Sequence, residues 1–327
     1  MSDAPSPQDV RDIGAGSTFG AARAGANAAR LHVAGVGHAY GLQIVLEDIA
    51  FELPAGRIVA LVGPSGCGKT TLLHLCAGLL VLQQGRIDNG FARSATMFQQ
   101  PRLLPWLSTR DNIALGLKAQ GVSRAQRYWM ADEVAQTLGL DAAALDRYPA
   151  ALSGGMQSRA ALARALVLAP DLLLMDEPFG ALDIGLKSHL HRLLLERQAR
   201  DGIAVLMITH DLMEAVRLAD TVLVMATDPG RIVHRQLLPA PALVRDEAAV
   251  YAGTAELLRV PAVRAAFGLD DDVARSSAGD LLTSAASSTA TSAASASAGV
   301  PAEALRFDVA NAADLPTPPR KASRWSC

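Results

Sequence analysis

Several features that are common in other classes of protein are scarce or missing in this sequence. The 327 residues include only three cysteines, and this odd count gives no support to a disulfide framework. The Cys and His residues nowhere show the spacing of zinc ligands. The longest apolar runs have the length of buried strands and fall short of the roughly 20 residues that span a bilayer. Basic residues are not in surplus, since the formal net charge is -2, so the composition does not indicate nucleic-acid binding.

The two ends of the chain lack the patterns of folded segments. Residues 1–28 are rich in Ala, Gly, Pro and Ser without apolar periodicity, so we expect a disordered tail. They also lack the apolar segment of a signal peptide, which favours a cytoplasmic protein. Residues 269–327 contain the run TSAASSTATSAASASAG and are expected to form a second disordered tail. The folded domain is therefore expected at 29–268.

Within this domain, short apolar runs alternate with segments of helical pattern. Such alternation predicts a parallel α/β sheet with helices packed on it. Two earlier runs, 31–36 and 44–53, are expected to form an N-terminal antiparallel sheet, and 108–168 is expected to be mostly helical. In parallel sheets, ligands bind at the carboxyl ends of the strands. The predicted buried strands are 57–63, 171–176, 203–210 and 221–226.

A glycine-rich segment follows the strand predicted at 57–63 and opens a helix. It matches the pattern GxxxxGK[ST] in the context that confirms a P-loop, which binds the phosphates of a nucleotide. Backbone N–H groups of such a loop surround the phosphates, the Lys69 ammonium reaches the outer ones, and the Thr70 hydroxyl can bind Mg²⁺. The residues expected to bind ATP here are Gly63, Pro64, Ser65, Gly66, Cys67, Gly68, Lys69, Thr70 and Thr71.

Cys67 has two interpretations, because it lies inside this loop. It can be a small residue that fits the turn, which is the interpretation we favour. Alternatively, it can be a reactive thiol, since the N-terminus of a helix lowers the pKa of a nearby thiol.

Two acidic residues follow each other where the strand predicted at 171–176 ends. Asp176 is placed to hold Mg²⁺ through water. Glu177 is placed to act as the base for a water molecule that attacks the γ-phosphate. An Asp-Glu pair after a strand is often only a solvated loop, but its position downstream of a P-loop and before Pro178 favours the catalytic interpretation.

Together with further segments, these motifs make the chain resemble the nucleotide-binding ATPases of ABC transporters. A signature-like segment at Leu152–Gly155, the run Ala181–Asp183 and His210 follow in the order of that family. The resemblance covers about residues 31–235. It implies an α/β fold with a P-loop NTPase core of the ABC type, an N-terminal antiparallel β subdomain and a helical signature subdomain at about 108–168.

The resemblance also implies a homodimer that binds ATP between its two copies. The P-loop of one copy and Ser153, Gly154 and Gly155 of the other would then contact the same nucleotide. A glycine inside a helix costs about 1 kcal/mol relative to alanine, and the close approach of the partner's phosphate explains both glycines. The other implied roles are adenine stacking by Tyr40, Mg²⁺ and water contact by Gln99, Mg²⁺ binding by Thr70 and Asp176, γ-phosphate contact by His210, and an action across the dimer by Asp183.

Three further segments refine the resemblance to one branch of the family. LLPW at 103–106, DEPFGALD at 176–183 and DPGRIV at 228–233 are similar to importers of nitrate, taurine and aliphatic sulfonates. We therefore expect an ATPase that powers the import of aliphatic sulfonates or taurine, with nitrate, bicarbonate or a pyrimidine precursor as alternatives. The implied partners are two transmembrane permease subunits and a periplasmic substrate-binding protein, with the chain bound peripherally at the cytoplasmic face of the bacterial inner membrane.

A soluble ABC ATPase that acts on ribosomes or DNA is the alternative from a different class. Such proteins typically carry two cassettes or long inserted arms and often basic surfaces, whereas this chain has one cassette and no basic surplus. Ser158 departs from the family pattern, in which a glutamine is usual, and the sequence offers no explanation for it.

The P-loop assignment predicts that Lys69→Ala strongly weakens ATP binding, because the phosphates lose a positively charged hydrogen-bond donor. Titration with a fluorescent ATP analogue measures the change in affinity. An affinity equal to that of the wild type would contradict the assignment.

Overall fold

The computed structural model describes residues 29–180, 182 and 184–269 of the chain. The tail expected at 1–28 lies outside the described residues, as does the tail expected at 269–327 apart from Leu269. Both tails therefore stay predictions.

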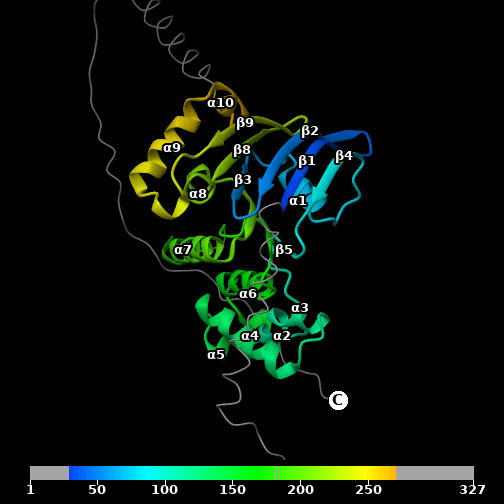
Figure 1. The fold of residues 1–327 in the computed structure, drawn as a ribbon, viewed down its shortest axis with the longest axis vertical. Coiled ribbons are helices and arrows are strands. Elements are labelled where there is room, and N and C mark those ends of the chain that lie inside the picture. Colours follow the sequence, from blue (N-terminus) through cyan, green and yellow to red (C-terminus); the bar gives the residue numbers. More distant parts are fainter. Residues whose placement is uncertain (1–28, 181, 183, 270–327) are drawn as a thin grey trace, which may run out of the picture. The chain divides into compact units, whose positions relative to one another are not determined.

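A six-stranded sheet forms the centre of the described domain (Figure 1). Its strands are, in order across the sheet, β5 (Ser94–Met97), β6 (Leu172–Asp176), β7 (Ala204–Thr209), β3 (Ile58–Val62), β8 (Thr221–Ala226) and β9 (Arg231–Leu237). The first five pair in parallel, and β9 pairs antiparallel with β8 at one edge. The predicted parallel α/β sheet is confirmed, but β5 and β9 were not among the predicted strands.

The residues of the central strands alternate between two hydrophobic cores, as the period of two in a β-strand requires. Every residue of β3 is buried. Ile58, Ala60 and Val62 belong to the core on the side of most helices, whereas Val59 and Leu61 belong to the other core. A strand buried on both faces shows a continuous apolar run, which is why the sequence identified these strands well.

A smaller antiparallel sheet lies beside the central one (Figure 1). It has the order β2 (Gln43–Pro54), β1 (Arg30–Tyr40) and β4 (Gln84–Asn89), which confirms the predicted N-terminal antiparallel sheet. Leu72 and Leu73 of helix α1 (Lys69–Cys76) share one core with Leu31 of β1 and Leu206 of β7. The helix that follows the P-loop is therefore packed by both sheets.

Five helices occupy the region that the sequence predicted to be helical. They are α2 (Thr109–Ile113), α3 (Leu115–Ala119), α4 (Arg124–Thr137), α5 (Ala142–Leu145) and α6 (Gly154–Leu166), with the short 3-10 helix η2 (Pro149–Ala151) before α6. Figure 1 shows α2 to α5 gathered on one side of α6, which packs against α2, α4 and β5. Helix α6 therefore connects this group to the edge of the central sheet.

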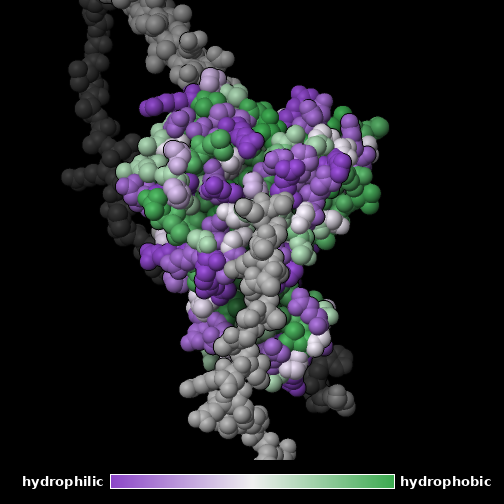
Figure 2. Space-filling model, viewed as in Figure 1, coloured by the Kyte–Doolittle hydropathy of each residue, from purple (hydrophilic) through white to green (hydrophobic). Residues whose placement is uncertain are grey.

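The remaining helices follow β6. They are α7 (Ile184–Asp201), α8 (Leu212–Leu218), α9 (Glu247–Arg259) and α10 (Pro261–Ala266), with the 3-10 helix η3 (Ala242–Val244) before α9. On the face shown in Figure 2, hydrophilic and hydrophobic residues are interspersed over the described domain. Among the described residues, no helix is long and apolar enough to cross a membrane.

Candidate functional site

The carboxyl ends of three neighbouring strands meet at one edge of the central sheet. Val62 at the end of β3 pairs with Thr209 at the end of β7, and Asp176 at the end of β6 pairs with Ile208. The P-loop, Asp176 with Glu177, and His210 each directly follow one of these ends. The strand register therefore brings together the motifs that the sequence analysis singled out, at the edge where α/β proteins bind ligands.

The P-loop closes around the side chain of Lys69. This ammonium group is buried, with 7 % of the residue exposed, and Nζ donates hydrogen bonds of 2.8 Å to the carbonyl oxygens of Gly63 and Pro64. Cys67 Sγ lies 3.5 Å from the same Nζ, and Cys67 is only 1 % exposed. Reactive thiols are at least partly exposed, so this burial favours the interpretation of Cys67 as a small residue that fits the loop.

Two glycines of the P-loop, Gly63 and Gly68, lie in close packing that leaves no room for a Cβ atom. A Cβ atom on Gly63 would lie 2.5 Å from the carbonyl oxygen of Met225, in the strand next to β3. A Cβ atom on Gly68 would lie 2.6 Å from Leu46 of the small sheet, and Gly68 also has a φ of +91°, which favours glycine. The loop can therefore lie against both sheets.

Thr70 and Asp176 form an oxygen-rich pair at the start of α1. The Thr70 hydroxyl donates a hydrogen bond of 2.9 Å to Oδ2 of Asp176, which is 3 % exposed. Burial raises the pKa of Asp176, although the hydrogen bond from Thr70 partly opposes this effect. The described residues contain no cluster of three or more His, Cys, Asp or Glu that could hold a metal. A hydroxyl and a single carboxylate nevertheless fit Mg²⁺, which usually takes one or two protein ligands beside phosphates and water.

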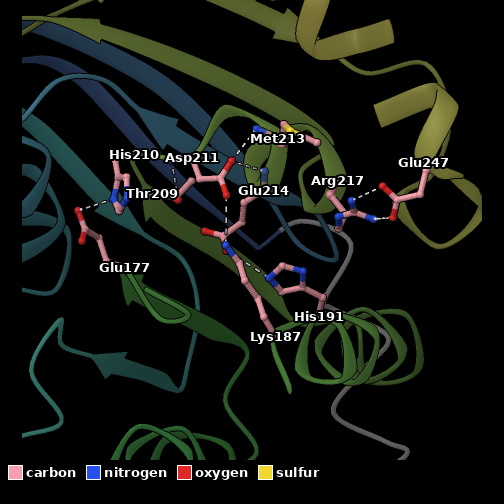
Figure 3. A network of polar contacts seen from close by, with 10 residues as sticks. All are labelled: Glu177, Lys187, His191, Thr209, His210, Asp211, Met213, Glu214, Arg217 and Glu247. Atoms are coloured by element: carbon pink, nitrogen blue, oxygen red, sulfur yellow. Dashed lines mark hydrogen bonds and ion pairs between the residues drawn. The ribbon is translucent and has the colours of Figure 1, made fainter. Parts of the chain in front are cut away.

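The three predicted catalytic residues meet, with Gln99 and His210 both in contact with Glu177. Gln99 Nε2 donates a hydrogen bond of 3.0 Å to Oε2 of Glu177. His210 Nδ1 lies 3.4 Å from Oε1 of the same carboxylate, as Figure 3 shows. Gln99 follows β5, Glu177 follows β6 and His210 follows β7, so the contacts join three neighbouring strands. The His210 side chain is 65 % exposed, which leaves this group open to a substrate.

The backbone of Glu177 has an unusual conformation that aims its side chain at this point. Its φ is +45°, which is rare for a residue other than glycine and marks local strain. The Glu177 N–H donates a hydrogen bond of 3.0 Å to the carbonyl oxygen of Ile208. This bond holds the turn after β6 against β7, so the position of the carboxylate depends on the neighbouring strand.

The signature-like segment forms the N-terminus of α6. Ser153 is the N-cap, and its Oγ accepts a hydrogen bond of 3.3 Å from the N–H of Met156. A Cβ atom on Gly154 would meet no atom within 4 Å, and one on Gly155 would lie 3.4 Å from Leu182, an ordinary contact. Neither residue has a positive φ. The contacts of the described residues therefore give no reason for glycine at these two positions, in contrast to the P-loop.

Ser158, which the sequence left unexplained, is a buried residue of α6. Its hydroxyl donates a hydrogen bond of 3.1 Å to the carbonyl oxygen of Gly154, one turn earlier. This local bond satisfies the hydroxyl without any further partner. Arg159 next to it donates to the carbonyl oxygens of Leu138 and Gly139, which ties α6 to the end of α4.

Two predicted residues stand apart from these contacts. Tyr40 lies at the end of β1, is 53 % exposed and touches the ring of His38 at a centroid distance of 4.9 Å. Its ring is thus free on one side for stacking, but no contact places it next to the P-loop. Asp183 lies outside the described residues.

Sequence reasoning missed Arg164, which holds the segment that follows Gln99. Its guanidinium donates hydrogen bonds of 2.8 Å and 2.9 Å to the carbonyl oxygens of Pro101 and Arg102. Arg164 therefore joins the signature helix to this segment. An arginine on a helix carries no sequence signal for such a contact, because its partners are backbone atoms distant in the sequence.

The fold and the site together define a P-loop ATPase cassette of the type found in ABC transporters. The chain belongs to the family of ABC transporter ATP-binding subunits. The family model described as ABC transporter matches residues 46–180.

Relatives with known names support this assignment. Taurine import ATP-binding protein TauB of Escherichia coli (strain K12) is 42% identical over 203 residues, which are 60% of this chain and 79% of that protein. The protein of the same name from Shigella boydii serotype 4 (strain Sb227) is 43% identical over the same lengths.

Two solved structures of a dimeric bacterial ABC transporter cassette are also similar, both with a TM-score of 0.60. They are 28% and 26% identical to this chain, and each match covers 64% of this chain and 99% of the other. The second of these cassettes is bound to ADP and Pi in a post-hydrolysis state.

The burial of Asp176 makes a prediction about stability. Because its pKa is raised in the folded protein, the ionised carboxylate destabilises the nucleotide-free fold at about pH 7. We expect Asp176→Asn, which keeps an oxygen acceptor for Thr70, to raise the melting temperature there. The gain should shrink as the pH falls through the folded-state pKa, because the wild-type group then becomes neutral too. Scanning calorimetry over this pH range measures the difference, and a lower melting temperature at pH 7 would contradict the prediction.

Proposed function

We propose that this chain is the ATP-hydrolysing subunit of an importer for taurine or related aliphatic sulfonates. The observation that carries its catalytic part is the meeting of Glu177, Gln99 and His210 directly beside the P-loop and the Thr70–Asp176 pair. The substrate follows from the relatives, which are named as taurine import proteins. Nitrate, bicarbonate or a pyrimidine precursor is a weaker alternative, since only the general form of the importer motifs supports it.

The residues at the strand ends suit each part of ATP hydrolysis. The N–H groups of the P-loop and the Lys69 ammonium bind the phosphates, so Lys69 exchanges its carbonyl partners for phosphate oxygens. Thr70 and Asp176, with Gln99, would hold Mg²⁺, which when bound neutralises negative charge on the outer phosphates. Gly63 to Thr71 thus fix the leaving ADP while the γ-phosphate faces Glu177.

Glu177 and His210 act on the γ-phosphate and the attacking water. The water oxygen forms a bond to the γ-phosphorus, the bond to the β–γ bridging oxygen breaks, and the proton of the water passes to the Glu177 carboxylate. His210 donates a hydrogen bond to the γ-phosphate, and Gln99 orients the water. Oε2 of Glu177 contacts Gln99 and Oε1 contacts His210, so the carboxylate is oriented before the nucleotide binds.

The glycines of α6 support a second copy of the chain as the partner in this site. Contacts among the described residues do not require glycine at 154 or 155, which supports a constraint from outside the chain. The N-terminus of a helix attracts anions, and glycine lets a phosphate approach its N–H groups. Ser153 adds a hydroxyl, Asp183 would act across the dimer, and Tyr40 would stack on the adenine.

The dimer would bind two permease subunits at the cytoplasmic face of the inner membrane, and a periplasmic protein would select the substrate. An action on ribosomes or DNA is less well supported, because the named relatives are import proteins and the net charge is -2.

The test of this function is taurine uptake by cells of the source organism that lack the gene. Wild-type protein should restore uptake of labelled taurine, whereas Glu177→Gln should not, because an amide cannot accept the proton of the attacking water. The purified Glu177→Gln variant should still bind ATP and accumulate as an ATP-bound dimer, which size-exclusion chromatography detects. Undiminished turnover in this variant would remove Glu177 from the catalytic role, and normal taurine uptake without the gene would remove taurine as the substrate.

The dimeric site predicts an unusual effect of Gly154→Ala. The free energy of unfolding should stay unchanged or rise by up to about 1 kcal/mol, since the new Cβ meets no atom of its own chain. ATPase activity should fall at least about tenfold, because the same Cβ would crowd the partner's phosphate. Chemical denaturation and steady-state turnover measure the two effects. Full activity in the variant would show that no phosphate approaches this backbone.

A further inference from the structure

A buried carboxylate joins helix α8 to helix α7. Glu214 of α8 is 4 % exposed, and its Oε1 lies 2.8 Å from Lys187 Nζ and 3.2 Å from His191 Nε2, both on α7 (Figure 3). Burial alone would raise the pKa of Glu214, but hydrogen bonds from His191, Lys187 and Thr209 outweigh it and lower this pKa to about 2. The carboxylate is therefore ionised and paired whenever the protein is folded near neutral pH.

Lys187 also binds the residue that follows His210. Its Nζ lies 3.1 Å from Oδ2 of Asp211, while Oδ1 of Asp211 caps α8 through the N–H groups of Met213 and Glu214. The N–H of Asp211 donates to the Thr209 hydroxyl at 3.1 Å. The Lys187 ammonium group thus holds the end of the His210 segment that leads into α8. Thr209 at the other end is tied to Asp211 and to Glu214, both of which Lys187 contacts.

His191 extends the contacts to the segment that carries Glu177. Its ring packs edge-to-face on Phe179 with a centroid distance of 4.6 Å, and Phe179 is 1 % exposed. Lys187 and His191 stand four residues apart and therefore lie on one face of α7. This face contacts the two segments that bear Glu177 and His210, whose side chains lie 3.4 Å apart in the site.

We propose that Lys187, His191 and Glu214 are positioning residues that set His210 relative to Glu177, so that the rate of ATP hydrolysis depends on the placement of α7. The proposal rests on the roles assigned to Glu177 and His210 under the proposed function. Helix α7 begins directly after Asp183, which the same proposal expects to act across the dimer. A shift of this helix on dimer formation would therefore move His210 without any direct contact between the partner and the histidine.

The first test compares Glu214→Gln with a control on the same helix. Glu214→Gln removes the charge that holds Lys187 and His191, so we expect kcat to fall about 10- to 100-fold, as a small misplacement of a catalytic group does, while KM for ATP changes less than about twofold. The control is Arg217→Gln, which breaks the exposed ion pair between Arg217 and Glu247 (Figure 3) and should leave kcat within about twofold of the wild type. An unchanged kcat in folded Glu214→Gln would overturn the proposal.

A double-mutant cycle distinguishes positioning from a general loss of structure. If Glu214 acts through His210, Glu214→Gln should lower the single-turnover rate by less than about twofold in a His210→Ala background. The same decrease in both backgrounds would overturn the proposal. Should His210→Ala alone leave the rate unchanged, the role of His210 under the proposed function fails, and this inference fails with it.

Two further measurements test the same proposal independently of whether Glu214→Gln is well folded or active. Lys187→Met should reproduce the fall in kcat, and Lys187→Arg, which keeps the positive charge, should restore most of it. In protein with labelled histidines, the ring ¹³C signal of His210 should shift in Glu214→Gln and stay in place in Arg217→Gln. An unmoved His210 signal in Glu214→Gln would overturn the proposal whatever the activities are.

Discussion

The parallel pairing of β6, β7 and β3 is the constraint on which the rest of the site depends. It aligns Asp176 with Ile208 and Val62 with Thr209, so the P-loop, Glu177 and His210 leave the sheet at one edge. A shift of one residue would turn every side chain of a strand to the opposite face. The two hydrophobic cores resist such a shift, because each takes alternate residues of the same strands. Burial on both faces thus fixes the relative positions of the P-loop, Glu177 and His210.

The glycines of the P-loop and of the signature-like segment differ in their surroundings. Gly63 and Gly68 are required by neighbouring atoms of the same chain, which a Cβ would approach within 2.5 Å and 2.6 Å. A Cβ atom on Gly154 would meet no described atom within 4 Å, so packing among the described residues does not explain this glycine. The comparison separates glycines that the fold requires from a glycine that the contacts of the described residues leave unexplained, which sequence patterns alone present as the same kind of motif.

The P-loop and the Asp176–Glu177 pair were predictable from the sequence because each is formed by residues that are adjacent in the chain. A P-loop needs adjacent residues between a strand and a helix, and Asp176 with Glu177 needs only the end of an apolar run. Ser158 departed from the family pattern without an explanation in the sequence. In the structure its hydroxyl donates a hydrogen bond to the carbonyl oxygen of Gly154 in the preceding turn. Strand β9 lies at the edge with alternating exposure and offers no long apolar run to identify it.

The sequence by itself determined the alternation of the buried strands with helices and the identity of the phosphate-binding loop, because periodicity and short motifs depend on neighbours along the chain. From the same motifs it predicted the residues that act on ATP. The tertiary structure alone decided that Glu177 receives both Gln99 and His210, that Arg164 holds the segment after Gln99, and that Lys187 and His191 of α7 meet Glu214 of α8. These contacts join residues that are far apart in the chain. Only the packing of the helices and the strand register brings such groups within bonding distance.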